Sequence, residues 1–159
     1  MNAVLGLDTR LTDDHHESLR LWLRLLTCTH LVETHVRKAL ATQFKTTLPR
    51  FDLMAQLERA PQGLQMGELS RRMLVTGGNV TGIVDQLERS GLIVRTADPA
   101  DRRAYLVKLT KEGRRLFAQM AAQHESWIVA LFSGIPKREQ RALNKSLSRL
   151  RVQLTRKPQ

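Results

Sequence analysis

The stretch that decides the fold is DPADRRAYLVKLTKEG, residues 98–113. It places two aspartates and a double arginine between an apolar run, LIV at 92–94, and an alternating segment from Tyr105 to Leu109. Two strand-like segments around a charged turn are typical of a β-hairpin. A short hairpin with a basic tip needs a scaffold, so its role depends on the segments before and after it.

Short helical segments precede the hairpin. Residues 50–60 and 66–73 carry apolar side chains at helical spacing, and the turn LVTGGN separates them from a helix over 77–90 that Gly91 ends. Two short helices joined by a tight turn, the second with small polar residues at its start, form a helix-turn-helix pattern. Because a hairpin directly after such a pair is a wing, the sequence predicts a winged helix-turn-helix.

Longer helices flank this unit. No Pro or Gly interrupts residues 15–48, and a helix of about 28 residues would be about 40 Å long, which suits packing against another subunit or connecting two lobes. A helix starting near Thr110 ends at Gly134 and Pro136, and leucines three or four residues apart mark a last helix. The predicted fold class is mainly α with a small β-hairpin wing and a helical dimerisation layer. Its expected parts are an N-terminal arm and long dimerisation helix at 1–48, the winged helix-turn-helix DNA-binding domain at 49–112 and C-terminal dimerisation helices at 113–159.

Charge and composition narrow the partners. Lys and Arg total 26 against 15 Asp and Glu, a formal net charge of +11, which favours polyanions, although charge also serves solubility alone. The start of the chain lacks a signal-peptide pattern, and no run approaches the roughly 18 apolar residues of a membrane span. One cysteine, Cys28, excludes an internal disulfide framework. We expect a cytoplasmic protein with no membrane partner.

The wing suggests one DNA contact. A hairpin beside a helix in the major groove can insert an arginine into the minor groove, where a narrow groove's negative potential attracts it. Either Arg102 or Arg103 takes this role, while Asp98 and Asp101, Asp101 above all, brace the turn and the other arginine. For this segment taken alone, a solvated turn is the alternative.

The start of the helix over 77–90 suggests the other contact. A helix N-terminus offers backbone N–H groups to phosphate, Asn79 can pair with adenine, and the Thr81 methyl group can meet a thymine methyl. Simple N-capping is the alternative for Asn79 and Thr76. Gln86 and Arg89 lie on the exposed side. The predicted DNA-contacting residues are Thr76, Gly77, Gly78, Asn79, Thr81, Gln86, Arg89, Asp98, Asp101, Arg102 and Arg103.

Residues 48–117 resemble the MarR family of bacterial transcriptional regulators. They contain, in the family's order, GELSRRM, a recognition helix ending LERSGLIVR, the wing DPADRRAYLVKLT and then TKEGRRLF. The D-x-R-R element corresponds to Asp98 or Asp101 with Arg102 and Arg103. The resemblance implies a winged-helix homodimer whose first and last helices interlock. It also implies a repressor on a near-palindromic operator, released by a small ligand and needing no cofactor.

An effector class is implied too. LRLWLRLLTCTHLVETHVRKAL and TTLPRFDLMAQLERAP are similar to segments of MarR regulators of hydroxycinnamate and aromatic-acid breakdown, which respond to aryl-CoA thioesters or aromatic acids. His30 and Arg37, polar groups on an otherwise apolar helix side, could pair with an anionic ligand. Core packing is the alternative for Trp22 and Trp127. The predicted effector-binding residues are Trp22, Leu26, His30, Arg37, Phe51 and Trp127.

Two other functions remain open. Some relatives sense organic peroxides through a single cysteine near the start of the first helix, but Cys28 lies well inside the predicted helix, where a buried thiol is usually inert packing. A sequence-indifferent architectural DNA-binding protein is the other alternative, because the charge alone supports it. An enzyme is not expected, since no metal-ligand spacing is present and Cys28 has no obvious positioned base.

Overall fold

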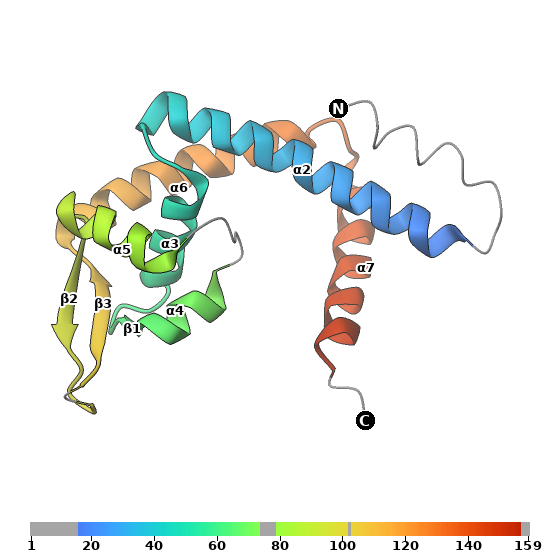
Figure 1. Ribbon diagram of the computed structural model, residues 1–159. Helices are drawn as coiled ribbons and strands as arrows, with labels where there is room; N and C mark the ends of the chain where they lie inside the picture. The colour runs from blue at the N-terminus through green and yellow to red at the C-terminus, as the bar shows by residue number, and fades with distance from the viewer. Residues whose placement is uncertain (1–15, 74–78, 102, 157–159) are drawn as a thin grey trace. The chain divides into compact units, whose positions relative to one another are not determined.

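Helices dominate the computed structural model, and a small antiparallel sheet interrupts them (Figure 1). Residues 16–73, 79–101 and 103–156 are described, and they form two units, within Met1–Ala122 and Gln123–Gln159. The predicted fold class, mainly α with a small β-hairpin wing, is confirmed. The domain boundaries expected after residues 48 and 112 stay predictions. In chain order the elements are α2 (Glu17–Phe44), α3 (Leu48–Glu58), β1 (Leu64–Gln65), α4 (Met66–Arg72), α5 (Val80–Arg89), β2 (Ile93–Ala97), β3 (Tyr105–Leu109), α6 (Lys111–Phe132) and α7 (Lys137–Thr155).

The sheet has three strands rather than the two that the sequence predicts. The strand order is β1-β3-β2, and β2 and β3 form the expected hairpin, in a register that pairs Ile93 with Leu109 and Ala97 with Tyr105. β1 adds to the other edge of β3, where Leu64 pairs with Val107. A strand of two residues is too short to show an alternating pattern, so the sequence analysis missed it. As a result, the base of the wing is supported on both sides of β3.

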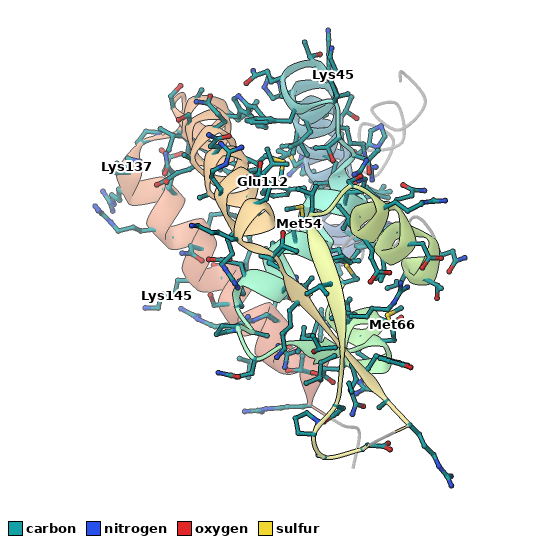
Figure 2. The ribbon with its side chains drawn as sticks, turned by 90° about the vertical axis from the view of Figure 1, so that its left-hand side faces the viewer. Lys45, Met54, Met66, Glu112, Lys137 and Lys145 are labelled. Carbon is teal, nitrogen blue, oxygen red and sulfur yellow. The ribbon has the colours of Figure 1, made fainter. Side chains whose placement is uncertain are left out.

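The core of the first unit forms around α3. Thr47 caps this helix by accepting a hydrogen bond from the Arg50 N–H at 3.4 Å, as its place before Pro49 predicts. Met54, labelled in Figure 2, is fully buried, and Phe51 stacks on Phe117 of α6 with 5.5 Å between ring centroids. The buried apolar side chains of α3, α5 and the sheet therefore hold the helix-turn-helix and the wing on one core. Those less than 2% exposed include Leu53, Met54, Leu57, Leu87, Val84 and Val107.

The first helix has the predicted length, and its buried residues lie in its C-terminal half only. α2 contains 28 residues, and its buried members, Val36 and Leu40, lie in its C-terminal half. Toward its start, Trp22 is 56% exposed. Four leucines of this region, Leu19, Leu21, Leu26 and Leu31, are also exposed. In the described part of the chain, no helix combines the length and hydropathy that a membrane span requires.

A glycine fixes the start of α6 against the sheet. Thr110 caps the helix by accepting a hydrogen bond from the Gly113 N–H at 3.0 Å, while its own hydroxyl donates to the Gly91 carbonyl at 2.7 Å. A Cβ atom on Gly113 would lie 1.9 Å from the Leu92 carbonyl oxygen. The helix can approach the strand this closely only because residue 113 has no side chain.

The second unit consists of the end of α6 and α7. The Gln140 side chain donates hydrogen bonds to the Phe132 and Ile135 carbonyls, at 2.9 and 2.8 Å, and so holds the turn between the two helices. α7 has leucines at the expected spacing, but none of its residues is buried. Its apolar side therefore remains uncovered within the described chain.

Candidate nucleic-acid interface

α5 is amphipathic, with a buried apolar side and an exposed polar side. Ile83, Val84 and Leu87 are buried in the first unit, and the opposite side carries exposed residues that the sequence predicts as DNA contacts: Thr81, Gln86 and Arg89. An amphipathic helix of this kind is fixed in place by its apolar side while its polar side stays available to a groove.

Asn79 occupies the N-cap position of α5, but its side chain makes no capping hydrogen bond. The alternative role of Asn79, N-capping by its side chain, is therefore not observed. Its side-chain amide lies close to Gly82 instead. The other predicted residues at this helix start, Thr76, Gly77 and Gly78, lie outside the described residues. Their contacts with DNA stay predictions.

The two aspartates of the wing organise the turn between β2 and β3. Asp98 is buried, and its carboxylate accepts hydrogen bonds from the Gln65 side chain at 2.7 Å and the Ala100 N–H at 2.8 Å. Asp101 accepts a hydrogen bond from the Arg103 N–H at 2.9 Å. The sequence analysis expected the aspartates to brace the turn and an arginine side chain. The described contacts are made with the backbone and with Gln65 instead, as in Asx-turns.

The hydrogen bonds around Asp98 favour its charged form. The bond from Gln65, followed by the one from the Ala100 N–H, holds the pKa of the Asp98 carboxyl below its usual range. Gln65 belongs to β1, the strand that the sequence analysis missed. The third strand therefore supplies the side chain that fixes the wing turn.

Arg103 is the described arginine at the wing tip. Its side chain is exposed, and its guanidinium makes no hydrogen bond or ion pair with another described residue. Because the Asp101 carboxylate holds the backbone of Arg103, the base of the side chain is positioned while the guanidinium stays available. The other candidate, Arg102, lies outside the described residues.

Arg95 connects the wing to α5, a contact that the sequence analysis missed. From β2 its guanidinium donates to the carboxylates of Asp85 and Glu88, and its backbone N–H donates to Glu88 at 3.2 Å. The hydrogen bond to Asp85 raises the pKa of Arg95 above its ordinary value. This clamp of Arg95 on Asp85 and Glu88 fixes the direction of the hairpin relative to the helix and offsets two negative charges on α5. The sequence signal for this contact was the three-residue spacing of Asp85 and Glu88, which places both carboxylates on one side of the helix.

The predicted effector residues are found in different surroundings. Trp22, Leu26 and His30 are exposed on α2, whereas Phe51 is buried in the core against Phe117. Trp127 lies in the second unit, half-buried and edge-on to His124, with 6.5 Å between ring centroids. Arg37 lies 15 residues after Trp22 in α2, about 22 Å along the helix axis. Their role in effector binding stays a prediction.

One expectation about Cys28 is wrong. Its place well inside the helix predicts a buried thiol, but the Cys28 side chain is exposed on α2. The surface of an isolated helix does not reveal whether a partner covers it, and the pattern of one cysteine among leucines could not show which way it points. The described residues contain no cluster of three metal-binding side chains.

A helix-turn-helix followed directly by an antiparallel hairpin, with polar α5 and basic wing-tip side chains exposed, defines a winged-helix protein of the DNA-binding type. Residues 44–104 match a sequence profile described as the MarR family. The crystal structure of a MarR family transcriptional regulator from Silicibacter pomeroyi has a TM-score of 0.78 at 30% identity, over 91% of this chain and 100% of that one. The chain belongs to the MarR family.

Other relatives extend the comparison. The uncharacterized HTH-type transcriptional regulator YkoM of Bacillus subtilis is 39% identical over 82 residues, which span 52% of this chain and 52% of YkoM, about half the length of that relative. The structure of CouR from Rhodococcus jostii RHA1, bound to p-coumaroyl-CoA, has a TM-score of 0.69 at 28% identity, over 82% of this chain and 90% of CouR. YkoM and the Silicibacter pomeroyi protein are named as transcriptional regulators.

Proposed function

We propose that this protein regulates transcription by binding a near-palindromic DNA operator as a homodimer, as a repressor that a small ligand releases. One observation carries the proposal: the Arg95 clamp joins α5, with its exposed polar side, to a wing that presents Arg103 on a fixed turn. A helix and a wing held in one geometry suit simultaneous contact with a major groove and the adjacent minor groove. The net charge of +11 supports a polyanionic partner, and such a protein would work in the cytoplasm, where bacterial DNA lies.

The homodimer is supported by the apolar side chains left uncovered at both ends of the chain. Trp22 in α2 is 56% exposed, and Leu154 in α7 is 75% exposed. Soluble chains rarely leave such stretches in contact with water. In a two-fold symmetric dimer, two copies of α5 would meet half-sites about one helical turn, roughly 34 Å, apart.

For the effector we propose an aromatic acid or an aryl-CoA thioester. The support is the similarity to CouR, whose structure holds p-coumaroyl-CoA. The candidate contacts are those predicted from the sequence: Trp22, Leu26, His30, Arg37, Phe51 and Trp127.

Capture of genomic fragments tests the DNA-binding function. The purified full chain is incubated with fragments of its source genome at about 0.15 M salt, where non-specific contacts are partly screened, and the retained fragments are sequenced. Enrichment of one inverted repeat is expected. Even retention of all fragments would instead support the architectural alternative, because binding would then depend on charge alone.

The captured repeat then provides the effector test. p-Coumaroyl-CoA and p-coumarate are titrated separately against the protein–DNA complex, with free coenzyme A as the control. Release by the thioester or the acid, but not by coenzyme A, is the expected result. Release only after treatment with an organic hydroperoxide, lost in Cys28→Ser, would replace this effector class with the peroxide alternative.

A further inference from the structure

An open cleft of about 450 Å³ lies beside α5, where the start of α3 and the last turns of α2 meet it. It is separate from the wing and belongs entirely to the first unit. Five of its eight lining residues have polar or charged side chains, and none of the eight carries a carboxylate. The lining residues are Arg37, Thr47, Pro49, Arg50, Asn79, Gly82, Ile83 and Gln86.

Two arginines from different helices give the cleft its charge. Arg37 of α2 is about half exposed and lies 3.5 Å from the Glu33 carboxylate, one turn earlier, which offsets part of its charge. Arg50 of α3 donates through Nη2 to the Ser90 hydroxyl at 3.4 Å. Its Nε atom is buried without a partner and is not open to a ligand, whereas its Nη1 atom makes no hydrogen bond with another described residue. The Arg50 guanidinium therefore retains donors for an anionic acceptor.

α5 begins at the same cleft. Asn79 stands at its N-cap without a side-chain capping bond, so the first-turn N–H groups are not satisfied by that side chain. The partial positive charge of the helix start adds to that of Arg37 and Arg50. The cleft thus combines two guanidinium groups, side-chain amides and a helix start, all of which attract an anion.

We propose that this cleft binds a backbone phosphate of the operator DNA, an inference that rests on the proposed function. Asn79 and Gln86, which line the cleft, are also predicted base contacts of α5. A helix in the major groove, about 12 Å wide, has a sugar–phosphate backbone on each side. A group held next to Asn79 and Gln86 would therefore lie at the wall of the groove that α5 enters. Such a contact fixes the depth and register of the helix without reading sequence.

The lining favours phosphate over an aromatic effector. Pro49 and Ile83 are its principal apolar members, which is little surface for an aryl ring, whereas Arg37 and Arg50 match the oxygens of a phosphate. This assigns Arg37 to DNA binding, in contrast to its predicted role in the effector site. The two assignments give different results in one set of variants.

The test measures how affinity for the captured repeat depends on salt. Arg50→Gln and Arg37→Gln each remove one charge, as does the control Arg149→Gln on α7. In a dimer with two clefts, each cleft variant should lower the slope of log K against log salt by up to about 1.8, because full loss of the phosphate contact in each cleft removes about 0.9. The control should leave it unchanged. In Arg37→Gln the carboxylate of Glu33 loses its partner and could itself repel DNA. The double variant Glu33→Gln/Arg37→Gln should have the same salt slope as Arg37→Gln, which would exclude this repulsion as the cause. If Arg50→Gln does not fold, Arg37, at the surface, still provides the test.

A second measurement locates the contact on the DNA. Uncharged methylphosphonate replaces one phosphate at a time along the repeat, and each duplex is titrated with the wild type and with Arg50→Gln. At one position per half-site, methylphosphonate should weaken binding by the wild type. It should not weaken binding by Arg50→Gln any further, because that variant has already lost the contact. Additive losses at every position would overturn the inference.

The remaining outcomes separate the inference from the proposed function. If the wild type retains no specific fragment, both fail. If it binds the repeat but the cleft variants keep the wild-type salt slope, only the phosphate site fails. If those variants also require more p-coumaroyl-CoA for release, the cleft belongs to the effector, and the inference is overturned while the proposed function stands.

Discussion

α3 and α7 both carry leucines at helical spacing, such as Leu53 and Leu57 in α3, yet α3 is largely buried and α7 is not. Seven of the 11 residues of α3 are buried, and none of the 19 residues of α7 is. Leucine spacing predicts a helix in both cases, but it does not say which surface will cover the leucines. For α3 the cover is α5, the sheet and α6 of the same unit, whereas for α7 we propose the second copy of the chain. The comparison separates what this chain stabilises alone from what it leaves for a partner.

Truncating one leucine in each helix should give the largest difference. Leu53 in α3 is fully buried, so Leu53→Ala should lower the free energy of unfolding by about 2–5 kcal/mol through lost apolar contacts and a cavity. Leu147 in α7 is 39% exposed, so Leu147→Ala should weaken dimer association instead. Urea unfolding over a range of protein concentrations distinguishes them, since only a loss of association depends on concentration. Equal, concentration-independent losses would mean that α7 is not an interface.

Two glycines extend the comparison to the backbone. Gly113→Ala places a methyl group 1.9 Å from the Leu92 carbonyl oxygen, so α6 must move away from the sheet. The expected cost is about 1–3 kcal/mol or more, as for overpacked cores. Gly134 in the second unit has no atom within 4 Å of an added Cβ, so Gly134→Ala is the matched control and should change stability little. Thermal unfolding of both variants gives the answer, and comparable losses would contradict the close approach of α6 to β2.

Charge provides a third contrast, between the wing and α7. Arg103→Ala should weaken binding to the captured repeat by about 1–3 kcal/mol without changing stability, because the side chain is exposed in the free protein and is expected to enter the groove in the complex. Arg138→Ala on α7 removes the same charge from a solvated surface and should have a much smaller effect. Fluorescence anisotropy at fixed salt measures both. If Arg103→Ala unfolds the protein, or if Arg138→Ala weakens binding equally, the wing has no special part in recognition.

Much of the fold was predictable because the residues that begin and end its helices and strands are local signals. Pro49 marks the start of α3, Gly91 and Gly134 follow the ends of α5 and α6, and alternation from Tyr105 to Leu109 predicts β3. These signals act over a few residues, so a single sequence carries them. The fold class followed from their order.

The details of the site depend on contacts between distant residues. Gln65 reaches Asp98, 33 positions later, and its two-residue strand leaves no periodic pattern. Arg95 could have paired with solvent or DNA, and only the packing of β2 on α5 brings it to Asp85 and Glu88. The sequence therefore predicted which residues carry the charge of the wing but not which groups hold them in place.

The smallest effect is expected at Asp98, whose hydrogen bonds hold only the wing turn and the neighbouring side chain of Gln65 in β1. Because the Gln65 side chain and the Ala100 N–H lower the pKa of Asp98 in the folded state, its carboxylate stabilises the fold above its unfolded pKa of about 3.9. That contribution is lost as the pH falls through the lower folded value. Wild type should therefore exceed Asp98→Asn in stability at neutral pH, and the two should converge as the pH falls below the folded pKa of Asp98.

Urea midpoints of both proteins from pH 2 to 7 measure this difference, and Gln65→Ala isolates its first cause. Removing the Gln65 amide should raise the pKa of Asp98, followed by NMR of its carboxyl carbon, toward the ordinary value, while Leu53 and the rest of the α3 core stay folded. A difference between wild type and Asp98→Asn that stays constant down to pH 2 would show that the charge of Asp98 is irrelevant to the wing. The wing turn would then be held by its backbone hydrogen bonds, such as the one from the Asp98 N–H to the Ala104 carbonyl at 3.0 Å.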